Sequence, residues 1–288
     1  MPSGILHALL IRFRVIAEFL IRSSTEAYSR RERKRLNSAF DPFSTCAALV
    51  IANGPSADTI IDKEASQGTF ARGRNQICII GMNRFWGSSS ISRLSLDFLV
   101  LSDSIYLEQD SDLNHGLLEF LRSNPSTGLL VPFGWRKQSF ILDLENPTYF
   151  FDDRSLELLS KNTKPWRPRG FMTSTALKAL AISTTYFKDT FIVGFDNNLF
   201  LGLKVTEENR IFQDPNHSSK SHTAGSHEIT LRYPNGVADY FFDVARMFKD
   251  LELFRRKGIT NLDPLSLTNH FPKNQRGLLE WLTHHQDL

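Results

Sequence analysis

Histidines that could act as a general base gather in one polar stretch, residues 216–228, which reads NHSSKSHTAGSHE. His217, His222 and His227 recur there at intervals of five residues. Imidazole titrates near neutral pH, so a histidine can take the proton from a hydroxyl group with little change of its pKa. With Asp214 close by, the same histidines could bind zinc, but such spacings on a loop lack the regularity of a preformed metal site. We therefore favour proton transfer over metal binding.

A second set of polar residues follows the apolar segments that have the composition of buried strands. In chain order, these segments end on Asn53, on Asn83, on Ser102 with Asp103, and on Asp196. In open α/β sheets, ligands bind in the crevice outside the carboxyl ends of the strands. One crevice is therefore expected to hold all of these side chains.

The first of these strand ends, Asn53-Gly54-Pro55-Ser56, leads directly into a segment suited to a helix. Gly54 would let the backbone approach a ligand closely, and Ser56 could cap the helix or contact a phosphate. The free N–H groups of a helix start favour an anion. The alternative is that Pro55 and Ser56 form an ordinary helix start. The glycine-rich dinucleotide fingerprint and the P-loop are both absent from the sequence, so neither NAD nor ATP binding is indicated.

The elements that must position these residues alternate between strand-like and helix-like along the chain. Continuous apolar strands separated by helices predict a mostly parallel, doubly wound sheet of the Rossmann-like α/β type, with both faces covered. The expected strands are 46–52, 75–82, 96–103, 128–133 and 189–196. The expected helices are 55–65, 171–184, a long one within 233–258 and a last one within 274–285.

The composition of the chain limits the classes of protein to which it can belong. The chain has 288 residues, 41% of them hydrophobic, which is enough for one substantial core. Its formal net charge is only +3, and basic residues concentrate at 28–37, so a nucleic-acid groove across the domain is not expected. The only two cysteines, Cys46 and Cys78, lie in or beside apolar runs, which indicates a reducing compartment and a cytoplasmic location.

Residues 1–44 are expected to form a basic, amphipathic helical arm that precedes the main domain at 45–288. Arg12 and Arg14 interrupt its apolar segment, and each costs roughly 2.5 to 3.5 kcal/mol at a bilayer centre, which disfavours a membrane span. No signal-peptide cleavage site is recognisable. Two alternatives stay open: peripheral contact with the inner face of the membrane, or packing on the domain or on a second chain, including a second copy of this one.

Several short motifs together resemble a known family. The segments VIANGPS, GMNRFW, MTSTALKAL, IVGFD and SHTAGSHE occur in the order and approximate spacing found in the bacterial sialyltransferases of glycosyltransferase family 42. The C-terminal segment LELFRRKGITNLDPLSL also resembles the closing helix, strand and turn of that family. The similarity covers about residues 46 to 268, and it depends on the order of the motifs rather than on any single one.

The resemblance implies a GT-A variant of the Rossmann-like fold that binds CMP-sialic acid. Asn53, Gly54 and Ser56 match the donor-phosphate and ribose loop, and Asn83 matches a second donor contact. Ser102 is expected in the same crevice. Thr173 and Ser174 match a Thr-Ser pair facing the nucleotide, with an ordinary helix cap as the alternative. Gly194 and Asp196 match the strand end beside the nucleoside, with an ordinary turn as the alternative.

The resemblance also implies the catalytic groups. His227 matches the base of the family, and His222 is the second choice because Ser226 is inserted in the motif. The tyrosines that stabilise the departing phosphate in the family are missing after Asp196, and Asn198 or Tyr233 would have to replace them. The segment 199–228 is expected to form a lid that carries the base.

No metal is expected, because a nucleoside monophosphate leaves with less charge than a diphosphate. The acidic pairs Asp110 with Asp112 and Asp152 with Asp153 are interpreted as solvated.

The hypothesis is therefore a metal-independent, inverting transferase of glycan biosynthesis. It would move an acidic sugar from a CMP-activated donor to a hydroxyl group of an oligosaccharide or glycolipid acceptor. Two alternatives stay open. One is a transferase or pyrophosphokinase that uses another nucleotide donor, and the other is a catalytically silent module that binds a nucleotide or a carbohydrate.

Overall fold

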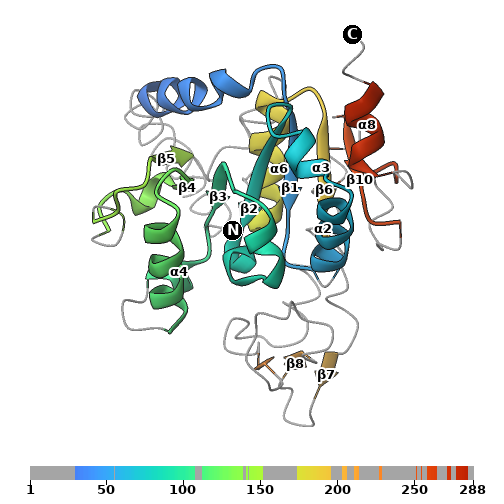
Figure 1. Cartoon of the computed structure of the whole chain (residues 1–288). Coiled ribbons are helices and arrows are strands. Elements are labelled where there is room, and N and C mark those ends of the chain that lie inside the picture. Colours follow the sequence, from blue (N-terminus) through green and yellow to red (C-terminus); the bar gives the residue numbers. More distant parts are fainter. Residues whose placement is uncertain are drawn as a thin grey trace, which may run out of the picture.

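A computed structural model gives the architecture of the chain (Figure 1). The residues that it describes are 30–54, 56–107, 112–138, 141, 143–151, 174–195, 203–205, 211–213, 227–228, 251, 254, 258–264, 271–273 and 277–284. At 203–205, 211–213 and 227–228 only the backbone is described. The first part of the predicted arm, most of the predicted lid and most of the predicted helix within 233–258 lie outside these residues.

The main sheet has seven strands in the order β10-β6-β1-β2-β3-β4-β5, and every neighbouring pair is parallel. The strands are β1 (Ala47–Ile51), β2 (Ile77–Met82), β3 (Phe98–Val100), β4 (Gly128–Pro132), β5 (Thr148–Phe151), β6 (Thr190–Val193) and β10 (Ile259–Asn261). The predicted doubly wound, parallel α/β sheet is confirmed. Strand β5 was not predicted.

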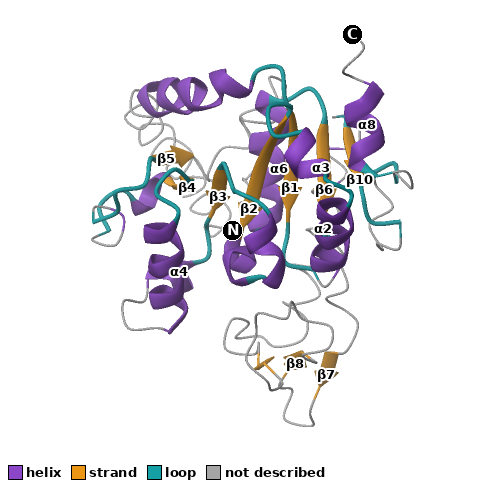
Figure 2. Ribbon diagram, in the orientation of Figure 1, coloured by secondary structure: helices purple, strands orange, loops and turns teal. Residues whose placement is uncertain are grey.

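Helices cover both faces of this sheet (Figure 2). The helices are the segment at residues 30–40, α2 (Ser56–Ser66), α3 (Thr69–Arg72), α4 (Asp112–Ser123), α6 (Thr175–Tyr186) and α8 (Leu278–His284). Short 3-10 turns follow several strands, among them η2 (Asn83–Gly87), η3 (Ser89–Arg93), η4 (Ser104–Leu107) and η5 (Phe133–Trp135). Another, η1 (Asp41–Phe43), precedes β1.

The central strands are buried on both sides, as the unbroken apolar runs at β1, β2 and β4 predict. Successive residues of a strand point to opposite faces, so β1 contributes Ala48 and Val50 to one core and Leu49 and Ile51 to the other. Helix α6 and the helix at 30–40 close the first core, and α2, α4 and α8 close the second. Both cysteines are buried free thiols, as predicted.

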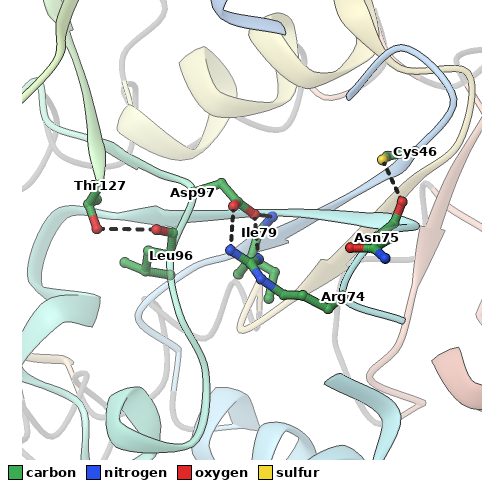
Figure 3. Close-up of polar contacts among 7 residues, drawn as sticks. All are labelled: Cys46, Arg74, Asn75, Ile79, Leu96, Asp97 and Thr127. Atoms are coloured by element: carbon green, nitrogen blue, oxygen red, sulfur yellow. Dashed lines mark hydrogen bonds and ion pairs between the residues drawn. The ribbon is translucent and has the colours of Figure 1, made fainter. Parts of the chain in front are cut away.

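The amino-terminal ends of the strands, called the amino edge below, are held together by polar bonds between neighbouring strands (Figure 3). Asp97 accepts two hydrogen bonds from Arg74, at 2.9 and 3.1 Å, and a third from the backbone N–H of Ile79 at 2.8 Å. The hydroxyl group of Thr127 donates to the carbonyl oxygen of Leu96 at 3.1 Å. These bonds fix the start of β2 against the starts of β3 and β4.

A small antiparallel sheet lies within the predicted lid segment. It consists of β7 (Leu203–Val205), β8 (Ile211–Gln213) and β9 (His227–Glu228), and it has the order β7-β8-β9. In Figure 1 it lies at the end of the molecule toward which the carboxyl ends of the main strands point.

Candidate functional site

The topological switch point of the main sheet lies between β1 and β6. The chain builds β1 to β5 outward in one direction and then returns through α6 to place β6 on the other side of β1. A topological switch point of this kind is where open α/β sheets bind ligands. This geometry selects the segment from Asn53 to Ser56 and the turn at Gly194 as the centre of the site.

Gly194 joins the two loops at this switch point. Its N–Cα torsion angle φ is +74°, a conformation that favours glycine, and a Cβ atom there would lie 2.5 Å from the carbonyl oxygen of Ala52. The carbonyl oxygen of Gly194 accepts a hydrogen bond from the N–H of Gly54 at 3.0 Å. The N–H of Gly54 therefore fixes one loop to the other.

Asn53 lies at the end of β1, immediately before the start of α2. Its side-chain oxygen Oδ1 is buried, yet it has no hydrogen-bond partner in the part of the chain that the structure describes. A buried polar atom without a partner costs about 1 to 3 kcal/mol, so such an atom calls for an explanation. A ligand that donates a hydrogen bond would satisfy it.

Asn83 occupies the corresponding position at the end of the neighbouring strand β2. It is the one described residue other than glycine with a positive φ, at 46°, and its Oδ1 atom is likewise buried and unpaired among the described residues. Asparagine tolerates this left-handed conformation better than most residues. Paired strands lie about 4.8 Å apart, so β1 and β2 bring Asn53 and Asn83 close to each other. Both lie at the carboxyl ends of the strands, called the carboxyl edge below.

The loop after β2 is held in place from two sides. On one side, the hydroxyl group of Ser88 donates to Asp58 of α2, and that of Ser90 donates to Asp62 at 3.1 Å. On the other side, the ring of Trp86 packs so closely on Gly116 of α4 that a Cβ atom at this glycine would lie 2.7 Å from the ring. The backbone around Asn83 is therefore rigidly placed.

The start of α6 reaches the same edge because α6 runs antiparallel to the strands. Ser174 caps the helix, and its hydroxyl oxygen accepts from the N–H of Leu177 at 3.3 Å. The neighbouring hydroxyl group, that of Thr175, is hydrogen-bonded at 2.6 Å to the hydroxyl group of Ser102, which follows β3. Ser174 thus has the capping role considered as an alternative, and the helix start still lies at the carboxyl ends of the strands.

Sequence reasoning missed several residues at this edge. Thr175 follows two other hydroxyl residues, and only the topology reveals its contact with Ser102.

Three further residues that the sequence did not single out carry a buried or half-buried charged or titratable group. Burial lowers the pKa of the Arg84 guanidinium next to Asn83, and burial, together with Asp103, raises the pKa of Tyr106. Lys178 is buried in α6, where a lone lysine between apolar residues was the available signal.

Strand β10 adds one more polar side chain beside the end of β6. Asn261 is fully buried, and its Oδ1 atom accepts a hydrogen bond from the N–H of Asp263 at 3.0 Å. Its side-chain nitrogen Nδ2 has no partner among the described residues. The hydrogen bond between Asn261 and Asp263 fixes the turn of the chain that follows β10.

The predicted site residues fall into two groups and one further residue, His227. The structure brings seven of them to the carboxyl edge of the sheet: Asn53, Gly54, Ser56, Asn83, Ser102, Ser174 and Gly194. Five lie outside the described residues: Thr173, Asp196, Asn198, His222 and Tyr233. His227 begins β9, where its backbone pairs with Gln213.

The chemistry of this edge suits a nucleotide phosphate. Helices α2 and α6 both start there, and the partial positive charge of a helix start attracts anions. An Asn Oδ1 atom accepts from a ribose hydroxyl group or from an exocyclic amino group of a base. Within the described ranges, no group of three or more His, Cys, Asp or Glu side chains could hold a metal ion.

The fold defines the class of this protein as Rossmann-like α/β. Comparison with protein-family models and with curated proteins found no match to the chain. In the part of the chain that the structure describes, every helix is too short or too polar to cross a bilayer.

Proposed function

We propose that this protein is a sialyltransferase-like glycosyltransferase that uses a CMP-activated acidic sugar. The acceptor would be a hydroxyl group of an oligosaccharide or a glycolipid. One observation carries the proposal: two helix starts and two unpaired asparagine oxygens lie along the carboxyl edge of the sheet, beside its switch point. The order of the sequence motifs supports the CMP donor.

The donor would lie along the carboxyl edge with its phosphate at the start of α2. Asn53 and Asn83 would accept hydrogen bonds from the ribose or the cytosine of CMP. The contact between Ser102 and Thr175 holds the start of α6 at the same edge, where it would line the other side of the site. Because CMP leaves as a monophosphate, hydroxyl groups, amides and helix starts would balance its charge without a divalent cation.

The reaction would proceed in one displacement. The acceptor oxygen attacks the anomeric carbon, a new C–O bond forms, and the bond from the anomeric carbon to the phosphate oxygen breaks. The electron pair of that bond leaves with CMP, and the configuration at the anomeric carbon is inverted. The proton of the acceptor hydroxyl group passes to His227, the first choice of base from the sequence.

The donor class is tested by isothermal titration calorimetry in the presence of EDTA. We expect CMP to bind without a metal and to bind more tightly than UDP or GDP. A preference for UDP or GDP that requires a divalent cation would indicate the alternative class of transferase instead.

The catalytic step is tested with CMP-sialic acid and a panel of oligosaccharide acceptors, by measuring CMP release. His227→Ala should lower kcat by about 10²- to 10⁴-fold and leave the Kd for CMP unchanged. His217→Ala, in the same segment of the sequence, is the matched control and should retain activity. Tight CMP binding without turnover in the wild-type protein would indicate a silent binding module.

A further inference from the structure

We infer that the outward side of the helix at residues 30–40 is a docking surface for an anionic lipid membrane. This surface, called the basic face below, consists of Arg30, Arg31, Arg33, Lys34 and Arg35, all of them exposed. The inference is independent of the chemistry proposed for the carboxyl edge, because it depends on a different part of the molecule.

The apolar side of this helix packs against the core of the domain. Leu36 and Phe40 are buried in the core. The ring of Phe40 lies 4.6 Å from that of Phe98 and 4.4 Å from that of Tyr186, measured between ring centroids. The hydroxyl group of Tyr186 also donates to the side-chain oxygen of Asn37 at 2.9 Å. The helix is therefore docked in one orientation, with its basic face toward solvent.

The charge of this face exceeds that of the rest of the protein. Residues 30–35 carry five basic side chains and one carboxylate, a formal charge of +4, whereas the whole chain carries +3. The carboxylate belongs to Glu32, which is buried and lies 3.5 Å from Arg35. Each basic side chain close to an anionic bilayer strengthens binding by about fivefold.

A membrane fits this face better than a nucleic acid does. Proteins that bind single strands combine basic residues with exposed aromatic rings on which bases stack. Here the one aromatic residue of the helix, Phe40, is buried. In addition, the basic face follows the apolar segment at residues 4–22 of the sequence with seven residues between them, a composition suited to a membrane interface.

The geometry also sets the orientation of the bound protein. Phe40 contacts Phe98 at the start of β3 and Phe187 just after α6, so the helix lies at the amino edge of the sheet. The candidate site lies at the opposite, carboxyl edge (Figure 1). A membrane on the basic face would leave the candidate site open to the aqueous phase.

Vesicle co-sedimentation with the full chain tests the surface. We expect binding to vesicles of phosphatidylcholine mixed with phosphatidylglycerol, little binding to phosphatidylcholine alone, and a decrease with added salt. The double variant Arg31→Glu/Lys34→Glu should bind at least about 25-fold more weakly. The matched control Lys63→Glu/Lys137→Glu changes two exposed lysines elsewhere by the same charge and should bind as the wild type does.

Circular dichroism and thermal unfolding of both double variants establish that they fold alike. Equal vesicle binding by the two variants would overturn the inference. So would binding to single-stranded DNA, lost in Arg31→Glu/Lys34→Glu, in a protein that does not bind the anionic vesicles.

Site-specific fluorescence tests the orientation. Ser38, exposed on the helix, and Lys137, exposed after β4, are replaced one at a time by Cys and labelled with an environment-sensitive dye. Both native cysteines are buried and should stay unlabelled. Anionic vesicles should shift the emission of the dye at Ser38→Cys to the blue and leave that at Lys137→Cys unchanged. A shift at Lys137→Cys alone would contradict the orientation.

Discussion

The two edges of the main sheet differ in how they pair their polar groups. At the amino edge, Asp97 accepts three hydrogen bonds, and the two N–H groups of the Asn146 side chain are shared among three carbonyl oxygens. At the carboxyl edge, Asn53 and Asn83 each keep a buried oxygen without a partner among the described residues. The amino edge is built for stability, and the carboxyl edge leaves bonding capacity for a ligand.

An unpaired oxygen alone does not mark a site. Gln76 and Thr190, at the amino edge, each leave one side-chain oxygen unpaired among the described residues as well. The carboxyl edge differs because its two unpaired oxygens follow adjacent strands, because one of them immediately precedes the start of α2, and because Asn83 adopts a positive φ. The combination, rather than any one feature, supports the proposed ligand site.

The largest effect should come from filling the close contact at the switch point. Gly194→Ala places a methyl group 2.5 Å from the carbonyl oxygen of Ala52 at a φ of +74°, so we expect it to destabilise the fold by about 3 kcal/mol or more. Urea unfolding measures this. Gly134→Ala, where no atom lies within 4 Å of the added Cβ, is the control and should change stability by less than about 0.5 kcal/mol.

A smaller loss is expected at the amino edge. Asp97→Ala removes the acceptor for Arg74 and for the N–H of Ile79 and should cost about 2 to 3 kcal/mol of unfolding free energy. Arg93→Ala breaks an exposed ion pair with Asp62 and should cost no more than about 0.5 kcal/mol. If the comparison of the edges is right, folded Asp97→Ala binds CMP as the wild type does. Weakened CMP binding by the folded variant would contradict it.

Alkaline pH should lower the free energy of unfolding through a buried thiol near the amino edge. Burial raises the pKa of the Cys78 thiol well above its ordinary value of 9.0. The folded state therefore keeps this proton while the unfolded state loses it, and stability that is fully present below pH 9.0 decreases above it. The unfolding free energy should fall by up to about 1.4 kcal/mol per pH unit for this thiol. Cys78→Val should reduce that slope, and an unchanged slope would exclude Cys78 as its source.

The smallest effect on stability is expected at Asn83. Asn83→Gly keeps the positive φ without strain and removes the amide, so stability should change by less than about 0.5 kcal/mol. Loss of one hydrogen bond should still weaken CMP binding about fivefold. Asn83→Ala should lose both affinity and stability, because alanine tolerates this φ poorly. Equal CMP affinity of Asn83→Gly and the wild type, measured by calorimetry, would remove Asn83 from the site.

The sequence predicted the central strands because strands buried on both faces appear as unbroken apolar runs, as in β1 and β2. It did not reveal β5, an edge strand whose first three residues are only half-buried. It also did not reveal α4, whose apolar pattern is interrupted by His115 and Gly116.

For the site, strand ends could be identified from the sequence, since polar residues follow apolar runs there. Contacts between distant elements could not. The bond between Ser102 and Thr175 joins residues 73 positions apart, and it exists because α6 returns antiparallel to the strands. The unpaired state of Asn53 and Asn83 likewise depends on packing that no local pattern encodes.

Hydrogen exchange with and without CMP tests the central claim most directly. If the carboxyl edge binds the nucleotide, CMP should slow amide exchange in peptides that cover residues 53–57, 83–87 and 174–177. Peptides at the amino edge, covering 74–77 and 96–98, should exchange at the same rate with and without CMP. Slowed exchange at the amino edge, with no change at the carboxyl edge under saturating CMP, would contradict the account.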